Sequence, residues 1–346
     1  MDAEGKREKK IKAGKLLGVA PILILAVMAV LTAGYLFLLQ QNITEDTEQM
    51  EYQYHIALIA GNKDTSFWKK VYEGAVEEGK KYGAYVEQVG EELAGATSIS
   101  DAVDIAVYEG VDGILFRPSD TRASMTMIER AQKAEIPVIT VQKDVTDSRR
   151  QGFVGINDYF LGMEYGKRIL KIADEDTRLV TVLFPGTSFN GVSQEWFRMG
   201  LKNTVRNGKI RFDFQIVQDA NGLNNAEDII HDITMGKTTS PDILICLDEV
   251  IALSACQLID NSALEKQPKI IGSYFSQEIL TAIEEEKMDS TITIDPKELG
   301  RMSVDALMTY KNYHMVSYYT EVKTMLIDRE TAGKYREEAY ADETLF

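Results

Sequence analysis

The chain has 346 residues, of which 45% are hydrophobic and 27% charged, a balance typical of a folded protein with a sizeable core. Its formal net charge is −16, and because residues 1–15 contribute +3, the remainder carries −19. Such an acidic chain is a poor candidate for binding nucleic acid or anionic lipid head groups. Cys246 and Cys256 are expected to be buried core residues rather than a disulfide, and without clustered histidines they predict no metal site.

The first element in chain order is an apolar run over Leu16–Leu39, directly after the basic residues 1–15. Its 24 uncharged residues would span about 36 Å as a helix, enough for a bilayer core of about 30 Å. The basic segment predicts a cytoplasmic N-terminus and an extracytoplasmic remainder. A cleaved signal peptide is the alternative, but its apolar region is normally shorter, and no cysteine follows the run to carry a lipid. We expect an uncleaved transmembrane helix over residues 16–39 and a polar tether over residues 40–53.

From residue 54 onward, short apolar runs alternate with segments of helical periodicity. Continuous apolar runs such as Val111–Phe116 predict strands buried on both faces, and segments such as Ser66–Tyr82 predict helices between them. The repeated order of strand, helix and strand predicts parallel sheets. About ten strands are too many for one compact sheet, so we expect an α/β fold of two doubly wound parallel-sheet lobes. The last strand is expected over Tyr319–Ile327, and residues 331–346 are expected to be an acidic tail with little structure.

Polar and aromatic residues follow several of the expected strands, where the chain leads into the next helix. In open α/β sheets, ligands bind beyond the carboxyl ends of the strands, so these residues form the candidate site. The candidate ligand-binding residues are Asp64, Thr65, Phe67, Trp68, Gln142, Lys143, Ser188, Asn190, Glu195, Trp196, Arg198, Asp219, Asp248 and Tyr274.

The two tryptophans, Trp68 and Trp196, each fall after the first strand of their half of the chain. Facing lobes would bring both rings to one cleft, where aromatic faces stack on sugar rings and polar groups bind hydroxyls. The alternative is that the rings only cover helix–sheet interfaces. We expect Lys143 and Asp248 on opposite lobes, within reach of a ligand. For Asp248 an N-cap role is the alternative, because a helix is expected to start at Glu249.

Catalytic motifs are missing from the sequence. There is no Gly-x-Ser-x-Gly elbow, no Gly-x-x-x-x-Gly-Lys-Ser/Thr phosphate loop and no Gly-x-Gly-x-x-Gly after the first strand. Carboxylate pairs are too common in a chain with 54 acidic residues to indicate acid–base catalysis. We therefore predict a binding protein without catalytic residues, metal or cofactor rather than an enzyme.

Short segments spread along Tyr54–Ile327 form a recognisable series. They are Ile56–Ile59, Phe67-Trp68, Glu73–Ala75, Val111–Ile114, Pro118–Asp120, Ile136–Thr140, Asp248-Glu249 with Ala252-Leu253, Ile270–Gly272, and Pro296 with Gly300. In this order and spacing they resemble the type I periplasmic binding proteins, especially the ribose- and galactose-binding components of ABC transporters.

The resemblance implies two lobes joined by three crossovers, near residues 157, 275 and 294, with the last helix returning to the first lobe. Lobe 1 would comprise residues 54–157 and 295–322. Lobe 2 would comprise residues 158–294 and 323–330.

At several positions the chain departs from its ribose-binding relatives. Gln142 and Lys143 stand where those proteins have an acidic residue and an arginine, and Tyr274 stands near the place of an aspartate. Leu247 and Ile294 replace an asparagine and a glutamine. The resemblance therefore carries over the fold but not the specificity for ribose.

The function that the resemblance implies is that of an extracytoplasmic solute-binding protein, which closes two lobes around a small polar ligand, a sugar, and delivers it to a membrane permease for ABC-type uptake. A second possibility stays open: a membrane-anchored sensory subunit that reports ligand occupancy to a histidine kinase without transport. A sugar-responsive repressor shares such lobes, but the predicted membrane span and the lack of a helix-turn-helix argue against it.

Overall fold

The computed structural model describes Met28 and residues 52–61, 65–89, 98–119, 121–186, 191–206, 208–217 and 223–340. The chain divides into two compact units, Met1–Glu51 and Tyr52–Phe346. Apart from Met28, the transmembrane helix predicted over residues 16–39 lies outside the described residues. Within the described part of the chain, no helix combines the length and the apolar character needed to cross a membrane.

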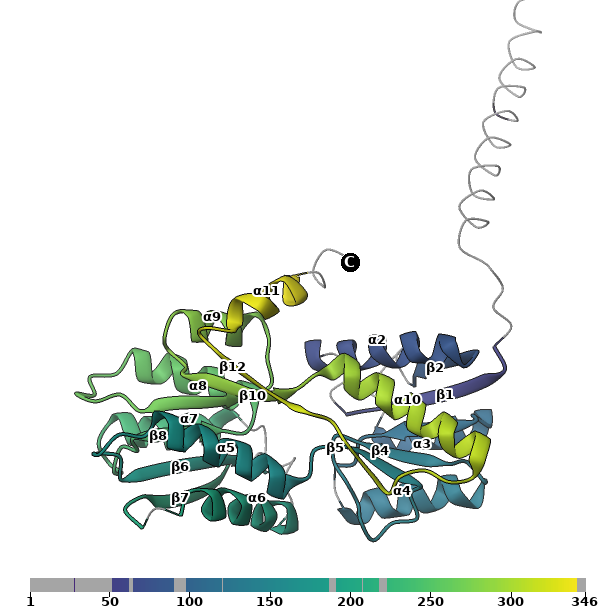
Figure 1. Cartoon of the computed structure of the whole chain (residues 1–346), viewed down its shortest axis with the longest axis horizontal. Coiled ribbons are helices and arrows are strands. Elements are labelled where there is room, and N and C mark those ends of the chain that lie inside the picture. Colours follow the sequence, from purple (N-terminus) through teal and green to yellow (C-terminus); the bar gives the residue numbers. More distant parts are fainter. Residues whose placement is uncertain are drawn as a thin grey trace, which may run out of the picture. The chain divides into compact units, whose positions relative to one another are not determined.

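The first lobe is built on a six-stranded sheet with helices on both faces (Figure 1). Its elements are β1 (Tyr54–Ile59), α2 (Ser66–Lys81), β2 (Ala84–Gln88), α3 (Ile99–Glu109), β3 (Gly113–Phe116), α4 (Thr121–Lys133), β4 (Val138–Val141), β5 (Gly152–Gly155), α10 (Pro296–Tyr313) and β11 (Tyr319–Glu321). The strand order is β11-β5-β4-β3-β1-β2, and every neighbouring pair is parallel. Helix α10 comes from late in the chain and packs beside α2.

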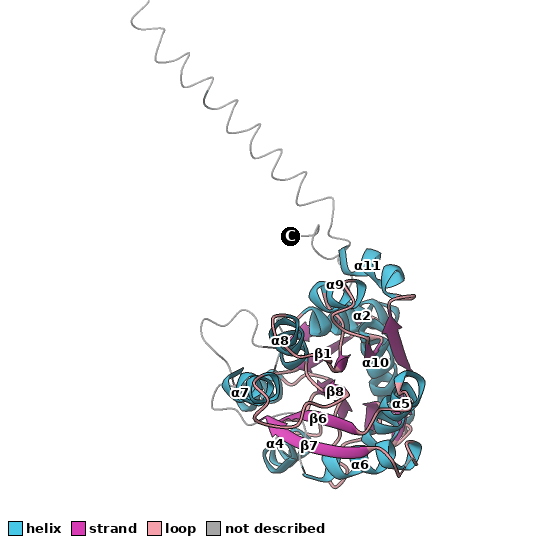
Figure 2. Ribbon diagram, turned by 90° about the vertical axis from the view of Figure 1, so that its left-hand side faces the viewer, coloured by secondary structure: helices cyan, strands magenta, loops and turns pink. Residues whose placement is uncertain are grey.

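The second lobe repeats this plan. Its elements are α5 (Asp158–Ile172), β6 (Leu179–Pro185), α6 (Gly191–Thr204), β7 (Arg211–Val217), α7 (Leu223–Thr234), β8 (Ile243–Cys246), α8 (Glu249–Asp260), β9 (Lys269–Ser273), α9 (Gln277–Glu284), β10 (Ser290–Ile294), β12 (Thr324–Asp328) and α11 (Ala332–Tyr340). The order β12-β10-β9-β8-β6-β7 matches that of the first sheet position by position. Here too helices cover the strands (Figure 2). The predicted two-lobe α/β fold is confirmed, except that β12 runs antiparallel to β10.

The chain passes between the two sheets three times. The crossings join β5 to α5, β10 to α10 and β11 to β12. The crossover expected near residue 275 is wrong, because the strands before and after it, β9 and β10, are neighbours in one sheet. The third crossing lies between Glu321 and Thr324, inside the segment predicted as one strand. Extended chain keeps the same side-chain period on both sides of a crossing, so the pattern does not reveal the change of sheet.

The central strands of each sheet are buried on both faces, as the continuous apolar runs predict. Every residue of β3, β4, β8 and β10 is buried. One hydrophobic cluster lies under α2 and α10, and a second under α3 and α4. A third lies under α5 and α6, and a fourth under α7, α8, α9 and α11. Cys246 and Cys256 belong to the fourth cluster as free, buried residues, as predicted.

Helices α2 and α10 pack with their backbones in contact, and this packing fixes the start of α2 beside the candidate site. A Cβ at Gly74 would overlap the carbonyl oxygen of Lys297, and a Cβ at Gly300 would overlap that of Val71. Glycine is required at both positions because any side chain would push the two helices apart.

The C-terminal segment forms a helix where the sequence predicts a tail with little structure. Helix α11 packs against α9, and Ala332 at its start is fully buried. The ring of Tyr335 lies 6.0 Å from that of Phe275, and Arg336 forms an ion pair with Glu284. The acidic composition of this segment favours exposure to solvent, and for that reason the sequence did not predict the few apolar contacts that hold it on the second lobe.

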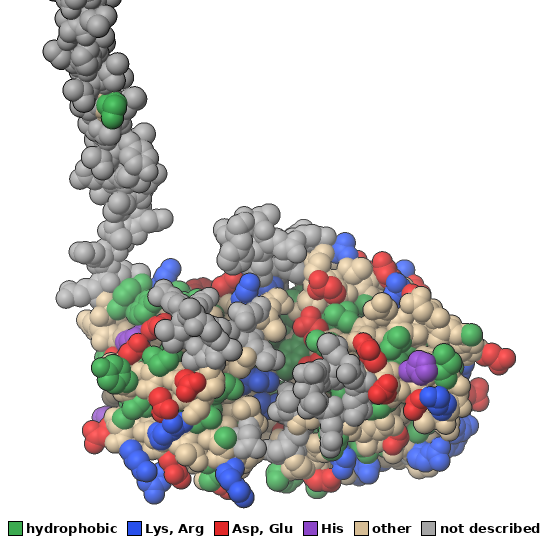
Figure 3. All heavy atoms as spheres, turned by 180° about the vertical axis from the view of Figure 1, so that it is seen from behind, with side chains coloured by type: hydrophobic (Ala, Val, Ile, Leu, Met, Phe, Trp, Pro, Cys, Tyr) green, Lys and Arg blue, Asp and Glu red, His purple; other side chains and the backbone are tan. Residues whose placement is uncertain are grey.

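Acidic and basic side chains lie side by side over both lobes on the face seen from behind (Figure 3). The described chain contains many ion pairs between such groups, for example Lys266 with Asp242 at 2.8 Å. Exposed pairs of this kind typically contribute only about 0–1 kcal/mol. Buried charges are therefore more informative about function than the surface pattern.

Candidate ligand-binding site

A cavity of about 620 Å³ lies between the lobes, and we call it the interlobe cavity. The first lobe contributes the segment after β4, and the second contributes the starts of α5 and α6. A smaller cavity of about 60 Å³, the hinge cavity, lies beside it and reaches Tyr274. The residues that line both cavities are Gln142, Lys143, Ile156 and Asp158. The carboxyl end of β4 and the first crossing therefore form one continuous polar wall.

Lys143 and Asp158 form an ion pair across this wall. Nζ of Lys143 lies 3.3 Å from Oδ1 of Asp158, and their side chains are only 15% and 20% exposed. Burial lowers the pKa of Lys143, and the negative charge of Asp158 partly opposes that shift. Because Asp158 starts α5, the pair joins the end of a first-lobe strand to the first helix of the second lobe.

Gln142 connects three elements through its amide group. Its Oε1 accepts a hydrogen bond from Nε of Arg117 at 2.8 Å, and its Nε2 donates to the hydroxyl of Tyr274 at 3.1 Å. Arg117 follows β3 and Gln142 follows β4, both in the first lobe, whereas Tyr274 follows β9 in the second. Burial raises the pKa of Tyr274, which stays a neutral phenol at physiological pH. The bond from Gln142 to Tyr274 thus holds the two lobes together directly.

The backbone at both ends of this contact is strained. Gln142 has φ of 67° and Tyr274 has φ of 63°, a left-handed conformation that residues other than glycine rarely adopt. Such a conformation costs on the order of 1–3 kcal/mol and persists where the surroundings enforce it, often at functional sites. The two strained residues meet at the point where the lobes touch.

The aromatic pair at the start of α2 is buried. Phe67 is 4% exposed and Trp68 is 3% exposed, and both belong to the core cluster under α2 and α10. The ring of Phe67 meets that of Tyr274 edge-on at 5.1 Å, and the guanidinium of Arg117 lies 5.8 Å from the Trp68 ring centre. The pair covers a helix–sheet interface and also forms the floor beneath Arg117 and Tyr274.

In the second lobe, Trp196 is the predicted site residue that reaches the interlobe cavity. Its ring is 48% exposed and meets that of Tyr159 edge-on at 6.5 Å. Glu195 and Arg198, one turn apart on α6, form an ion pair at 2.7 Å, and the Arg198 guanidinium lies 4.8 Å from the Phe214 ring centre. Neither Glu195 nor Arg198 is among the residues that line the two cavities.

The remaining predicted residues fall at helix starts or outside the described chain. Asp248 caps α8 by accepting hydrogen bonds from the backbone N–H groups of Val250 and Ile251, at 2.9 and 3.3 Å. Thr65 caps α2 by accepting from the N–H of Trp68 at 3.4 Å. Neither lines the interlobe or the hinge cavity. The residues that lie outside the described chain are Asp64, Ser188, Asn190 and Asp219.

The sequence did not predict Asp158, which lines both cavities, or Arg117, which lies behind the lining residue Gln142 and donates a hydrogen bond to it. Arg117 comes directly after the buried run of β3 and is 8% exposed. The sequence does show a basic residue directly after a buried strand. Because ligands bind beyond the carboxyl ends of parallel strands, this position could have been predicted as part of the site. Asp158 gave a weaker signal, since an acidic residue in the first turn of a helix is common without any ligand.

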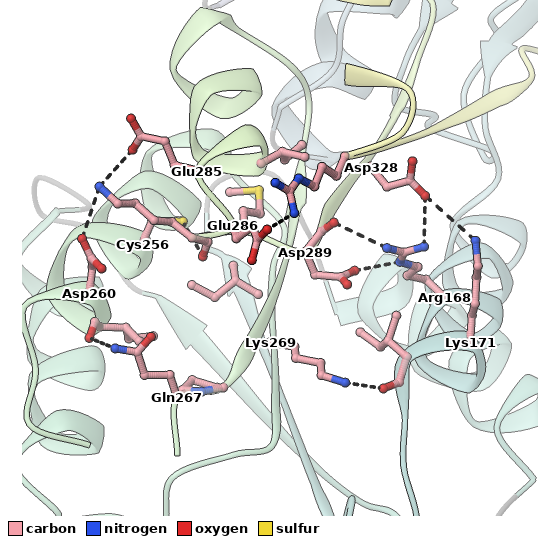
Figure 4. Close-up of a pocket in the computed structure, with 18 of the residues that line it drawn as sticks. Arg168, Lys171, Cys256, Asp260, Gln267, Lys269, Glu285, Glu286, Asp289 and Asp328 are labelled. Atoms are coloured by element: carbon pink, nitrogen blue, oxygen red, sulfur yellow. Dashed lines mark hydrogen bonds and ion pairs between the residues drawn. The ribbon is translucent and has the colours of Figure 1, made fainter. Parts of the chain in front are cut away.

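A third cavity, of about 600 Å³, lies in the second lobe near the amino ends of β9 and β10 (Figure 4). Arg168 in its wall contacts Asp289 at 2.7 Å and Asp328 at 3.4 Å, and Lys171 lies 3.9 Å from Asp328. Lys269 donates to a backbone carbonyl at 2.7 Å. Because these cations already have protein partners, the third cavity is a weaker candidate for a charged ligand than the interlobe cavity.

One group of described residues has the composition of a metal site: His55, Glu87 and Glu109. Their ligand atoms lie within 4.8 Å of one another, and His55 contacts Glu87 at 2.7 Å. None of the three lines a cavity described above. The group is separate from the candidate ligand-binding site.

Comparison with known proteins identifies the family. A family model described as a periplasmic binding protein domain matches residues 56–313. The ribose import binding protein RbsB of Bacillus subtilis (strain 168) is 22% identical in an alignment of 266 residues, which covers 73% of this chain and 80% of that protein.

Two solved structures share the fold. GanP, a glucose-galactose binding protein from Geobacillus stearothermophilus, aligns with a TM-score of 0.71 and 22% identity over 80% of this chain and 98% of its own. A chain from the XylFII-LytSN complex aligns with a TM-score of 0.67 and 23% identity, again over 80% and 98%. Since the family model covers most of the sequence, the chain belongs to the periplasmic binding protein family.

Proposed function

We propose that this member of the periplasmic binding protein family is an extracytoplasmic receptor that closes its two lobes around a sugar-like solute. One observation carries the proposal: the interlobe cavity is lined from both lobes by an amide, an ion pair and an exposed tryptophan, namely Gln142, Lys143 with Asp158, and Trp196. The amide and the two charged groups can together donate hydrogen bonds to sugar hydroxyls and accept hydrogen bonds from them. The flat face of an indole ring packs against a sugar ring. Sugar-binding relatives such as RbsB and GanP support the choice of ligand.

Closure is the proposed mechanism. The lobes are connected by only three crossings, so they rotate as bodies about the hinge cavity. In the closed form, Gln142 and Lys143 approach the solute from the first lobe and Trp196 from the second. Excluding water strengthens each of these hydrogen bonds, because the local dielectric falls. The partner then distinguishes the closed from the open form.

For uptake, the partner would be the permease of an ABC transporter. In this proposal residues 16–39 anchor the protein by a single membrane-spanning helix, with residues 1–15 in the cytoplasm and the binding domain outside. An anchor of this kind keeps the receptor near its permease, which raises the effective concentration for delivery.

Signalling without transport is the second candidate. One sequence-based prediction and one comparison favour it: the predicted anchor is a single helix rather than a lipid-modified cysteine, and one solved structure with this fold is a chain of the XylFII-LytSN complex. The partner here would be a sensor histidine kinase. Uptake of labelled ligand in cells with and without the gene separates the two candidates, since only a transport role makes uptake depend on this protein.

The proposed function is tested by a thermal-shift screen of the full-length chain, purified in detergent, against neutral sugars, polyols and sugar acids. A ligand at 100 times its dissociation constant adds about 2.7 kcal/mol to the free energy of unfolding. For a domain of this size that stabilisation raises the melting temperature by on the order of 5 °C. If no member of the three compound classes shifts the melting temperature, the proposed function is wrong.

A further inference from the structure

Arg117 is a buried cation that has no acidic partner among the described residues. It is 8% exposed, its Nε donates to the neutral amide of Gln142, and its guanidinium lies over the ring of Trp68. Among the described residues, no carboxylate lies within 4.0 Å of it. Its backbone N–H donates to the carbonyl of Ile59, which fixes the start of the side chain at the end of β3.

The other buried arginines of the described chain show how unusual this is. Arg150 is 6% exposed and forms an ion pair with Asp144, reinforced by a second hydrogen bond of 2.6 Å. Arg168 is 7% exposed and pairs with Asp289 at 2.7 Å. Proteins pair buried charges because removing an ion from water is costly. Within the described part of the chain, Arg117 therefore lacks the carboxylate partner that the other two buried arginines have.

The described charges near Arg117 have contacts of their own. Its positive charge reaches Lys143, and that lysine forms an ion pair with Asp158 at 3.3 Å. The charge of Asp248 reaches the neighbouring Tyr274, and Oδ1 of Asp248 accepts two backbone hydrogen bonds at the positive end of α8. Neither of these two described carboxylates forms an ion pair with Arg117.

Tyr274 occupies the space next to this cation. Its hydroxyl accepts from Gln142 Nε2, and its ring edge meets Phe67. Tyr274 belongs to the second lobe, whereas Arg117, Gln142 and Phe67 belong to the first, so the Tyr274 hydroxyl would leave Gln142 if the lobes opened. Gln142 lines the interlobe and hinge cavities, and Arg117 contacts this wall through its hydrogen bond to Gln142.

We propose that the ligand is a sugar acid, whose single carboxylate binds Arg117 and the amide of Gln142 while its hydroxyls bind the polar wall of Lys143 and Asp158. A planar carboxylate matches the fork of a guanidinium, and its negative charge would supply the direct partner that Arg117 lacks among the described residues. This inference rests on the proposed function, since it names the class of solute for the same site.

The experiment measures calorimetric binding of matched pairs to the full-length chain: D-glucose with D-glucuronate, and D-galactose with D-galacturonate, in which the acid keeps the ring of the neutral sugar. In at least one pair we expect the acid to bind roughly tenfold or more tightly than the neutral sugar, the range for a charge-assisted hydrogen bond. Raising NaCl from 50 to 500 mM should weaken binding of the acid and leave the neutral sugar unchanged. This measurement needs no variant.

Arg117→Gln should abolish the preference for the acid, and Arg117→Lys should restore part of it, because the charge returns without the planar fork. Arg122→Gln is the matched control, since Arg122 lies on α4 in the same lobe and is exposed. It removes one positive charge and should leave both affinities unchanged. Circular dichroism establishes that each variant is folded.

The outcomes separate this inference from the proposed function. Binding of a neutral sugar at least as tight as that of its acid overturns the sugar-acid assignment and leaves the proposed function standing. Tighter binding of D-glucose 6-phosphate than of any carboxylate also overturns the assignment. If no sugar, acid or phosphate binds at all, the proposed function itself fails.

Discussion

The two tryptophans provide a test in which one substitution should affect folding and the other binding. Trp68 is 3% exposed in the core of the first lobe, whereas Trp196 is 48% exposed at the interlobe cavity. Trp68→Ala removes a whole buried indole, which costs about 3–5 kcal/mol of folding free energy. It also removes the cation–π interaction between the Trp68 ring and the Arg117 guanidinium, which contributes about 0.5–2 kcal/mol. A loss of this size is a large share of a typical stability of about 5–15 kcal/mol.

Trp196→Ala should change the free energy of unfolding by less than about 1 kcal/mol, because half of the ring is already in contact with water. It should instead weaken ligand binding by about 1–3 kcal/mol, since the ring loses its stacking contact. Urea unfolding of the ligand-free, full-length variants followed by circular dichroism measures stability, because both substitutions alter tryptophan fluorescence. Calorimetry with a ligand found in the screen measures affinity. A Trp68→Ala variant that loses less than about 1 kcal/mol of stability would refute the assignment of Trp68 to the core.

Three further substitutions test the helix packing, the ion pair and the lobe contact. Gly300→Ala should lower the melting temperature in a thermal scan by several degrees, because the new methyl group cannot fit between α10 and α2. Burial lowers the pKa of Lys143 below its ordinary 10.5. As the pH rises towards 10.5, the folded chain therefore loses this proton before the unfolded chain does. In that window the free energy of unfolding should rise with pH. Lys143→Met should remove this rise, measured as unfolding free energy between pH 7 and 10. Tyr274→Phe removes the acceptor for Gln142 at a cost of about 1 kcal/mol, so the open fraction should rise about fivefold in small-angle scattering of ligand-free protein.

The fold follows from the sequence to the extent that it depends on local pattern. Apolar runs such as Val111–Phe116 predicted strands with both faces buried, and that burial is what the structure has. The mistaken crossover near residue 275 and the single strand over residues 319–327 have one cause in common. Period and composition describe a strand but not the sheet it joins, and here Val322 is buried in the first lobe while Thr324 already pairs in the second.

The sequence predicted some residues of the cavity walls but not the partners of those residues. The rule that ligands bind beyond strand ends selected Gln142, Lys143 and Tyr274, which line the cavities between the lobes. The same rule applied to Arg117 would have added it, but its lack of a carboxylate partner depends on what surrounds it in space. The pairing of Lys143 with Asp158 likewise depends on the contact between lobes, which no local pattern encodes.

The internal symmetry of the two sheets explains why two strained residues meet at the hinge. β4 and β9 occupy equivalent positions in the matching strand orders, and Gln142 and Tyr274 are each the first residue after one of them. Glycine at either position would relieve the left-handed backbone. Glycine would also remove the side chain that joins the lobes. The hydrogen bond between the lobes therefore requires two residues in a strained backbone conformation. In the proposed complex, a ligand beside Arg117 would replace the hydrogen bond from Gln142 to Tyr274, and the strength of that bond would set how much binding energy remains to stabilise the closed form.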